Sequence, residues 1–283
     1  MDELSLEQQF IDRGLANFFS VAKPFLKQAI YIKPVKINED ALAVGKSKFG
    51  GVPDLPPNME WPQDGGYAMA LVAQINFAEL QNAAPTEKLP KSGMLWMYYE
   101  TERSVSGFEQ SHKSGYAVRY FDGNLECLVR QKRPVNLPES AYFHAAELQF
   151  SATLEVPFYP SDLFDYEMSA EEEDAYYYDW CRLLPNPINK MLGHSNDIQN
   201  PQQIECQMYA NGFDADDPRR HEEPLRSELR KSATNWHLLL QIDSNWGECD
   251  MVWGDCGRFY LWITDEDLRA QRLENALLLT QCS

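Results

Sequence analysis

The chain has 283 residues, of which 44% are hydrophobic and 12% aromatic, and this composition excludes a disordered chain. Its 43 acidic residues outnumber the 25 basic ones, and the formal charge of -18 argues against nucleic acid and anionic membrane surfaces as partners. No segment has the apolar core of a signal peptide or the length of a membrane span, and the six cysteines form no CxxC pair, so we expect a cytoplasmic protein with reduced thiols.

The first thirty residues predict a helix over about 5–30. Apolar residues recur at helical spacing from Leu6 to Ala22, and Pro24 should kink or break the helix before a short continuation over Phe25 to Ile30. The expected role is packing against the body of the protein, and binding of a partner is the alternative. Residues 41–66, rich in glycine and proline, predict a long loop held in place by Met59 and Trp61.

Several strands are predicted in the first half of the chain. Met69 to Ile75 and Met94 to Tyr99 are apolar runs, and the second should be buried on both faces. Tyr116 to Phe121 and Leu125 to Arg130 flank Asp122-Gly123-Asn124 and predict a hairpin. Leu148 to Val156 alternates between apolar and polar residues, which predicts a strand with Glu155 on its solvent face.

The second half of the chain predicts helices followed by further strands. Residues 161–184 should form a helix capped by Ser169 with Glu172, and the polar residues 211–232 should form an exposed, mobile insertion. The expected strands are His237–Ile242, Phe259–Ile263 and Ala276–Cys282, with a short helix between Thr264 and Arg272. The fold class is therefore α+β, rich in mainly antiparallel or mixed sheet, with an N-terminal helix and short peripheral helices.

One sequence pattern occurs twice in the same order. A glycine loop that begins with a lysine is followed by an apolar strand containing a glutamine, and then by a glycine that precedes an aromatic run. The loops are Lys48–Leu55, with Gly50 and Gly51, and Lys190–Ile198, with Leu192 and Gly193; the glutamines are Gln74 and Gln241; the later glycines are Gly93 and Gly257. This predicts a single domain spanning 1–283, with pseudo-repeats at about 45–156 and 186–283 related by an approximate two-fold.

The same segments carry a resemblance to a known family. They are Gly-Gly-Val-Pro-Asp-Leu-Pro-Pro (50–57), Ala-Gln-Ile-Asn (73–76), Leu-Pro-Lys-Ser-Gly (89–93), Leu-Gly-His (192–194) with Ile-Gln (198–199), Val-Trp-Gly-Asp-Cys-Gly (252–257) and Asp-Glu-Asp-Leu-Arg-Ala (265–270). From about residue 45 to its end, the chain resembles the YwqG-like family of bacterial proteins, a domain of unknown function. The resemblance implies a mainly β, cytoplasmic α+β protein without an assigned reaction. Because some relatives are encoded near toxin systems, it is also consistent with an immunity-type role.

The sequence contains no strong motif for catalysis or metal binding. The five histidines are dispersed and no HExxH occurs, so we expect no metal site and no cofactor. The segment beginning at Asp243 lacks the glycine and glutamate of a calcium loop and is better interpreted as a turn. Cys256 follows Asp255, whose charge would disfavour a thiolate, and a structural role is favoured.

The two glutamines allow two interpretations. A buried amide must be hydrogen-bonded, so each glutamine could fasten the backbone of its own glycine loop. Alternatively, both motifs could line a cleft between the pseudo-repeats. The candidate cleft residues are Gly50, Gly51, Asp54, Trp61, Gln74, Asp197, Gln241, Asp243, Trp253 and Asp255.

Two functions therefore remain open. The favoured one is a non-enzymatic binding or interaction protein with an unknown protein or small-molecule partner. The alternative is a hydrolase-like enzyme that uses carboxylates of the cleft, with Asp54 and Asp255 as candidates for the general acid and base.

Overall fold

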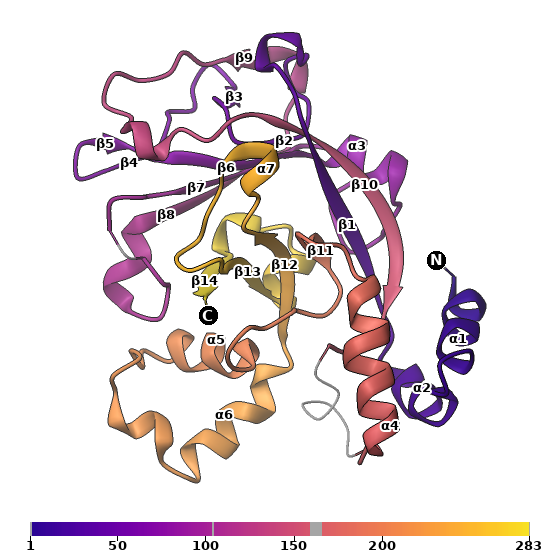
Figure 1. The fold of residues 1–283 in the computed structure, drawn as a ribbon. Coiled ribbons are helices and arrows are strands. Elements are labelled where there is room, and N and C mark those ends of the chain that lie inside the picture. Colours follow the sequence, from indigo (N-terminus) through magenta and orange to yellow (C-terminus); the bar gives the residue numbers. More distant parts are fainter. Residues whose placement is uncertain (1, 104, 159–165, 283) are drawn as a thin grey trace.

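The computed structural model describes residues 2–103, 105–158 and 166–282, and its main feature is one ten-stranded antiparallel sheet (Figure 1). Its strand order is β14-β13-β12-β11-β1-β10-β2-β6-β7-β8. The sheet curls until it is nearly barrel-shaped, and a backbone hydrogen bond from Thr280 to Ser106 ties β14 to the loop that follows β7. The predicted α+β class is confirmed.

The two central strands of this sheet, β1 and β10, are the longest, and the strands beside them, β11 and β2, are the shortest. The strands of the sheet are β1 Lys27–Lys36, β2 Lys48–Phe49, β6 Ala70–Asn76, β7 Met94–Tyr99, β8 Tyr116–Phe121, β10 Ala146–Glu155, β11 Asn189–Leu192, β12 Trp236–Asp243, β13 Arg258–Thr264 and β14 Leu277–Gln281. Two small ribbons lie beside it, formed by β3 Asp54–Leu55 with β9 Val129–Arg130 and by β4 Gln63–Asp64 with β5 Tyr67–Ala68.

The helices are all short; α1, α2 and α4 lie together at one side of the molecule, and α5 and α6 lie together at another (Figure 1). The helices are α1 Glu3–Ile11, α2 Ala16–Ala22, α3 Phe77–Ala83, α4 Ala170–Glu173 continued by the π-helix η7 Asp174–Trp180, α5 Gln202–Ala210, α6 Leu225–Ala233, α7 Trp246–Cys249 and α8 Asp265–Arg269. Several 3-10 turns lie between the helices and strands, including η1 Lys23–Phe25, η2 Glu39–Ala41, η4 Leu125–Cys127, η8 Cys181–Leu183 and η9 Pro218–His221.

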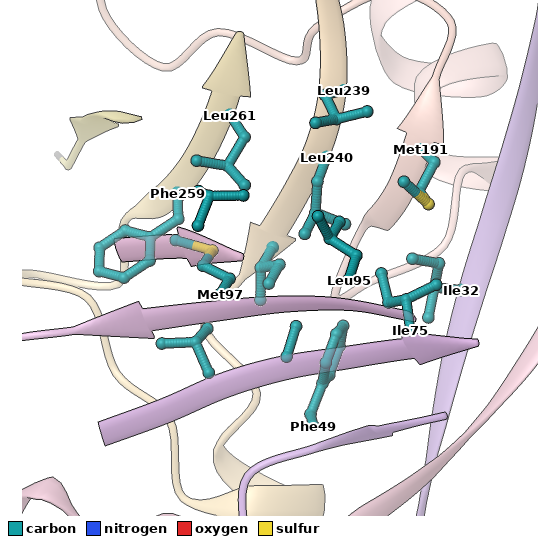
Figure 2. Packing of buried hydrophobic residues seen from close by; sticks show 14 of the residues in the cluster. Ile32, Phe49, Ile75, Leu95, Met97, Met191, Leu239, Leu240, Phe259 and Leu261 are labelled. Atoms are coloured by element: carbon teal, nitrogen blue, oxygen red, sulfur yellow. The ribbon is translucent and has the colours of Figure 1, made fainter. Parts of the chain in front are cut away.

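The core lies between the two facing halves of the sheet (Figure 2). Along β7, alternate residues such as Leu95 and Met97 point into it, and along β13 Phe259 and Leu261 do the same from the other side. The opposite faces of these strands are also covered: Trp96 packs under the ribbons, and Trp262 packs under α5. This explains why β7 is apolar at every position, as the prediction of a strand buried on both faces required.

The N-terminal region differs from the prediction of one helix over about 5–30. The helix breaks into α1 and α2 near Gly14, which adopts a positive φ of 76°, and the chain is extended as β1 from Lys27 onwards. The predicted helical continuation over Phe25 to Ile30 is therefore wrong. Hydrogen bonding decides this, because β1 pairs along its whole length with β10 and in part with β11, so tertiary pairing overrides local helical spacing.

A second prediction fails after β8. The residues around Asp122-Gly123-Asn124 do not form a hairpin, since β8 pairs with β7 and Val129–Arg130 pairs with β3. Asn124 instead caps the 3-10 turn η4, with its side chain accepting a hydrogen bond from the Glu126 amide. The strand predicted over 148–156 is confirmed as β10, but Glu155 is buried rather than exposed.

The predicted central helix and insertion are confirmed in part. Ser169 and Glu172 form the expected capping box at the start of α4, while residues 161–165 of the predicted helix lie outside the described residues. The segment 211–232 is not simply an exposed insertion, because it contains η9 and most of α6. It packs on α5 through Met208 and Phe213, and Arg220 is buried against Glu205.

The sheet can be described as two halves that correspond strand by strand. The first half comprises β10, β2, β6, β7 and β8, and the second comprises β1, β11, β12, β13 and β14; they meet at the β1–β10 pair. Lys48 pairs with Gln74 in one half, and Lys190 pairs with Gln241 in the other. Each glutamine strand has a register shift at the same distance before its glutamine. The second half thus includes β1, which lies before the predicted repeat 186–283.

Candidate functional site

The first glycine loop is held by Gln74, which is fully buried. Its carbonyl oxygen accepts hydrogen bonds from the Asp54 amide at 2.7 Å and the Trp96 indole at 3.0 Å. Its amide nitrogen donates to the Lys46 carbonyl and to the Asp54 carboxylate. Gln74 therefore joins the two ends of the loop that contains Gly50 and Gly51, as one of the two interpretations predicted.

The second loop is held in the same way by Gln241. Its carbonyl oxygen accepts from the Asn196 amide at 3.0 Å, and its nitrogen donates to the Ile188 carbonyl at 3.0 Å. Asn196 lies six residues after Lys190, as Asp54 lies six residues after Lys48. Leu192 and Gly193 both have positive φ, at 59° and 77°, and they correspond to Gly50 at 64° and Gly51 at 70°. A shared backbone conformation thus underlies the repeated motif.

Each loop also surrounds a buried ion pair. Lys48 donates to Glu39 at 2.7 Å and to the Val52 carbonyl, and Lys190 donates to both oxygens of Glu155 at 2.8 and 2.9 Å. Burial lowers the pKa of both lysines, and the adjacent carboxylates oppose this effect. These pairs leave little room at the loops: a Cβ at Gly51 would overlap Glu39.

The candidate aspartates Asp54 and Asp243 each pair with an arginine. Arg130 approaches Asp54 at 2.9 Å, and Arg258 approaches Asp243 at 3.0 Å. Although burial opposes the charge of Asp54, hydrogen bonds from Arg130 and Gln74 and the charge of Lys48 hold its pKa below the usual value. Both carboxylates are buried and bound to loop groups.

The other candidate residues are spread over the molecule. Trp61 donates to the Met69 carbonyl and fastens the long loop, and Asp197 accepts from Gln202 at the start of α5. Asp255 lies in an exposed turn before β13. Trp253 donates to the Asp243 carbonyl and also lines a pocket between the two halves. The repeated motifs therefore lie in separate loops and do not line one cleft. Among the candidate residues named above, Trp253 lines the pocket that we consider the best candidate for a binding site.

We call this site the seam pocket, and its volume is about 450 Å³. Its aromatic wall combines Tyr99 and Phe143 from one part of the chain with Trp253 and Phe259 from the other. Trp253 and Phe259 stack with their ring centroids 3.8 Å apart, Tyr99 lies 4.5 Å from Phe259, and Phe143 lies 5.4 Å from Trp253. Its polar rim includes Arg103, Ser106, Ser140 and Gln281.

The edge strands β8 and β14 leave a gap in the curled sheet. The seam pocket lies on one side of this gap, and the surface at the corresponding place on the other side is different. There, an open depression is lined by Arg119, Tyr120, Asp122, Ala270, Gln271 and Glu274. The strand registers equate Phe259 with Leu95, and Tyr99 with Ile263, so the second side has aliphatic residues where the seam pocket has rings. The strand arrangement therefore does not by itself require an aromatic wall, because the corresponding strand positions on the other side are aliphatic at these two places.

Sequence reasoning missed the charged groups that anchor the loops. Lys48 and Lys190 begin both copies of the motif, and this recurrence was the available signal. Glu39, Glu155 and Arg130 come from segments outside the repeated motif, and nothing in the sequence indicated that they would anchor the loops. Among the described residues, no group of three or more histidine, cysteine or acidic side chains could hold a metal ion. No helix within the described ranges is long and apolar enough to cross a membrane.

Comparison with known proteins identifies the family. A model for a domain of unknown function (DUF1963) matches residues 47–282, and the chain therefore belongs to this family. A search of curated proteins finds no match. The matched region begins after β1, although β1 is one of the two central strands of the sheet.

Proposed function

We propose that this member of the DUF1963 family is a non-enzymatic binding protein whose seam pocket receives an apolar group of a small molecule or of a protein partner. The observation that carries the proposal is the aromatic wall contributed by both halves of the sheet. A pocket of about 450 Å³ lies within the usual size range of small-molecule sites, which are mostly apolar with a few polar groups at the edge.

The charge distribution supports a binding role over carboxylate chemistry. A general acid or base must be able to exchange a proton with a substrate, but Asp54 is buried beside Arg130, and Asp255 lies in an exposed turn and is not among the residues that line the seam pocket. The net charge of -18 disfavours the approach of anions, so a neutral or cationic partner is preferred. Nucleic acid and membrane surfaces are not proposed as partners.

The proposal also covers the finer family assignment, the cellular location and the origin of the two halves. We place the protein among the YwqG-like proteins of bacteria, in the cytoplasm, and we propose that its two halves arose by duplication of one unit. Matching registers and loop geometries in the two halves support this origin. A protein partner would fit the immunity-type role that the family resemblance suggested.

A fluorescence titration with the neutral apolar probe N-phenyl-1-naphthylamine tests the seam pocket. The probe should bind with one-to-one stoichiometry, and Ser140→Trp should weaken binding at least tenfold by filling the pocket. Ser111→Trp is the matched control, because both serines are exposed and donate to a nearby glutamate, but Ser111 is not among the residues that line the seam pocket. Equal binding by both variants would refute the proposed site.

A further inference from the structure

A second cavity lies on the opposite side of the β1–β10 pair from the core, and it shares none of its described lining residues with the seam pocket. Its volume is about 190 Å³. The wall is apolar and consists largely of β10 and the helical segment η7–η8, with Val156, Trp180 and Leu184 among its residues. Empty apolar cavities of about 150 Å³ in other proteins accept benzene, so this one has room for a single ring.

One end of this cavity is polar and carries no net charge. The Lys190 ammonium and the Glu155 carboxylate form the buried ion pair described above, and the Tyr31 hydroxyl lies beside Glu155. His194 donates from Nε2 to the Phe25 carbonyl at 2.8 Å, and this assignment leaves Nδ1 as a hydrogen-bond acceptor. Burial lowers the pKa of His194 to about 3, so the ring is neutral at pH 7.

The equivalent site in the other half shows what is unusual about Lys190. Lys48 divides its hydrogen bonds between Glu39 and the Val52 carbonyl, and Asp54 lies 4.0 Å away. Lys190 directs both of its hydrogen bonds to Glu155. An ammonium group has three N–H donors, and the third donor of Lys190 has no partner among the residues that the structure describes. Lys190 also lines the cavity, whereas Lys48 lines neither of the two cavities compared here.

We infer that this cavity is a second ligand site, which takes a small neutral hydroxyl compound of about one ring, with the hydroxyl oxygen accepting from Lys190 and its hydrogen donated to His194. The apolar body of the ligand lies against Trp180 and Leu184. A neutral ligand is favoured because Glu155 already balances Lys190, so an added carboxylate or ammonium would leave an unpaired buried charge. The inference is independent of the proposed function of the seam pocket.

Isothermal titration of the full chain with phenol, benzene and benzoate tests this site. Phenol should bind about 5-fold to 30-fold more tightly than benzene, which is the range expected for one or two net hydrogen bonds. Benzoate should bind more weakly than either. Leu184→Trp fills the cavity and should abolish phenol binding, whereas Leu4→Trp, at an exposed position of α1, should leave it unchanged.

The role of Lys190 is tested by comparing two equivalent substitutions. Lys190→Met should remove the preference for phenol over benzene while benzene still binds, and Lys48→Met should retain the preference. Ser140→Trp should also leave phenol binding unchanged, which separates this site from the seam pocket. The inference is overturned if Leu184→Trp still binds phenol, if benzoate binds more tightly than phenol, or if the preference persists in Lys190→Met. Should Lys190→Met not fold, the Leu184→Trp and benzoate titrations still decide.

Discussion

Replacing Gln74 with leucine removes the side chain that holds the first glycine loop, and it should strongly destabilise the protein. The substitution keeps a similar volume but leaves two buried donors, the Asp54 amide and the Trp96 indole, without their acceptor. Each unsatisfied buried group costs about 1–3 kcal/mol, so we expect the two together to lower the free energy of unfolding by about 2–6 kcal/mol. That is a large fraction of the stability of a typical domain.

The same substitution in the second half gives a second test of this claim. Gln241→Leu leaves the Asn196 amide and the Ile188 carbonyl unpaired, and the expected loss is again about 2–6 kcal/mol. Gln149→Leu, at an exposed position of β10, is the control and should change stability by less than about 0.5 kcal/mol. Equilibrium urea unfolding measures all three. If Gln74→Leu costs no more than Gln149→Leu, the glutamines do not hold the loops.

Three further predictions concern the loops and their buried charges. The pKa of His194 is about 3 in the folded state and ordinarily 6.5, so the unfolded state binds more protons between these pH values. Stability should therefore fall on acidification from pH 6.5 towards 3. His194→Gln should flatten this pH dependence in urea unfolding. Gly50→Ala should lower the melting temperature more than Gly14→Ala, because a Cβ at Gly50 would overlap the neighbouring backbone while Gly14 has open space; equal shifts would contradict the geometry. Glu155→Ala leaves Lys190 as an uncompensated buried charge and should cost about 3–5 kcal/mol in urea unfolding, and a loss below about 1 kcal/mol would show that the pair is dispensable.

The parts of the fold that were predictable are those where burial dictates residue type. β7 and β13 are apolar runs because both faces of each strand are covered, and their boundaries agree closely with the prediction. β1 was missed because its identity depends on pairing with β10, a partner more than one hundred residues away. The turn residues after β8 satisfied a 3-10 cap as well as a hairpin, and local chemistry does not distinguish the two.

The candidate site was predictable to a similar degree. The two buried glutamines and their loops followed from a simple argument, namely that an amide within an apolar strand needs partners. Glu155 was assigned to solvent because strand alternation takes no account of Lys190, a residue brought beside it by tertiary structure. The aromatic wall of the seam pocket was equally hidden, since Tyr99 and Phe259 come from strands that face each other only after the sheet curls.

The central claim is that the seam pocket binds a ligand, whereas the corresponding depression lined by Arg119–Asp122 and Ala270–Glu274 does not. Hydrogen–deuterium exchange with and without saturating N-phenyl-1-naphthylamine tests it most directly. We predict protection at Tyr99–Arg103 and Val252–Phe259, and no change at Arg119–Asp122 or Ala270–Glu274 on the other side of the sheet gap. Equal protection on both sides, or protection confined to Arg119–Asp122 and Ala270–Glu274, would contradict the claim.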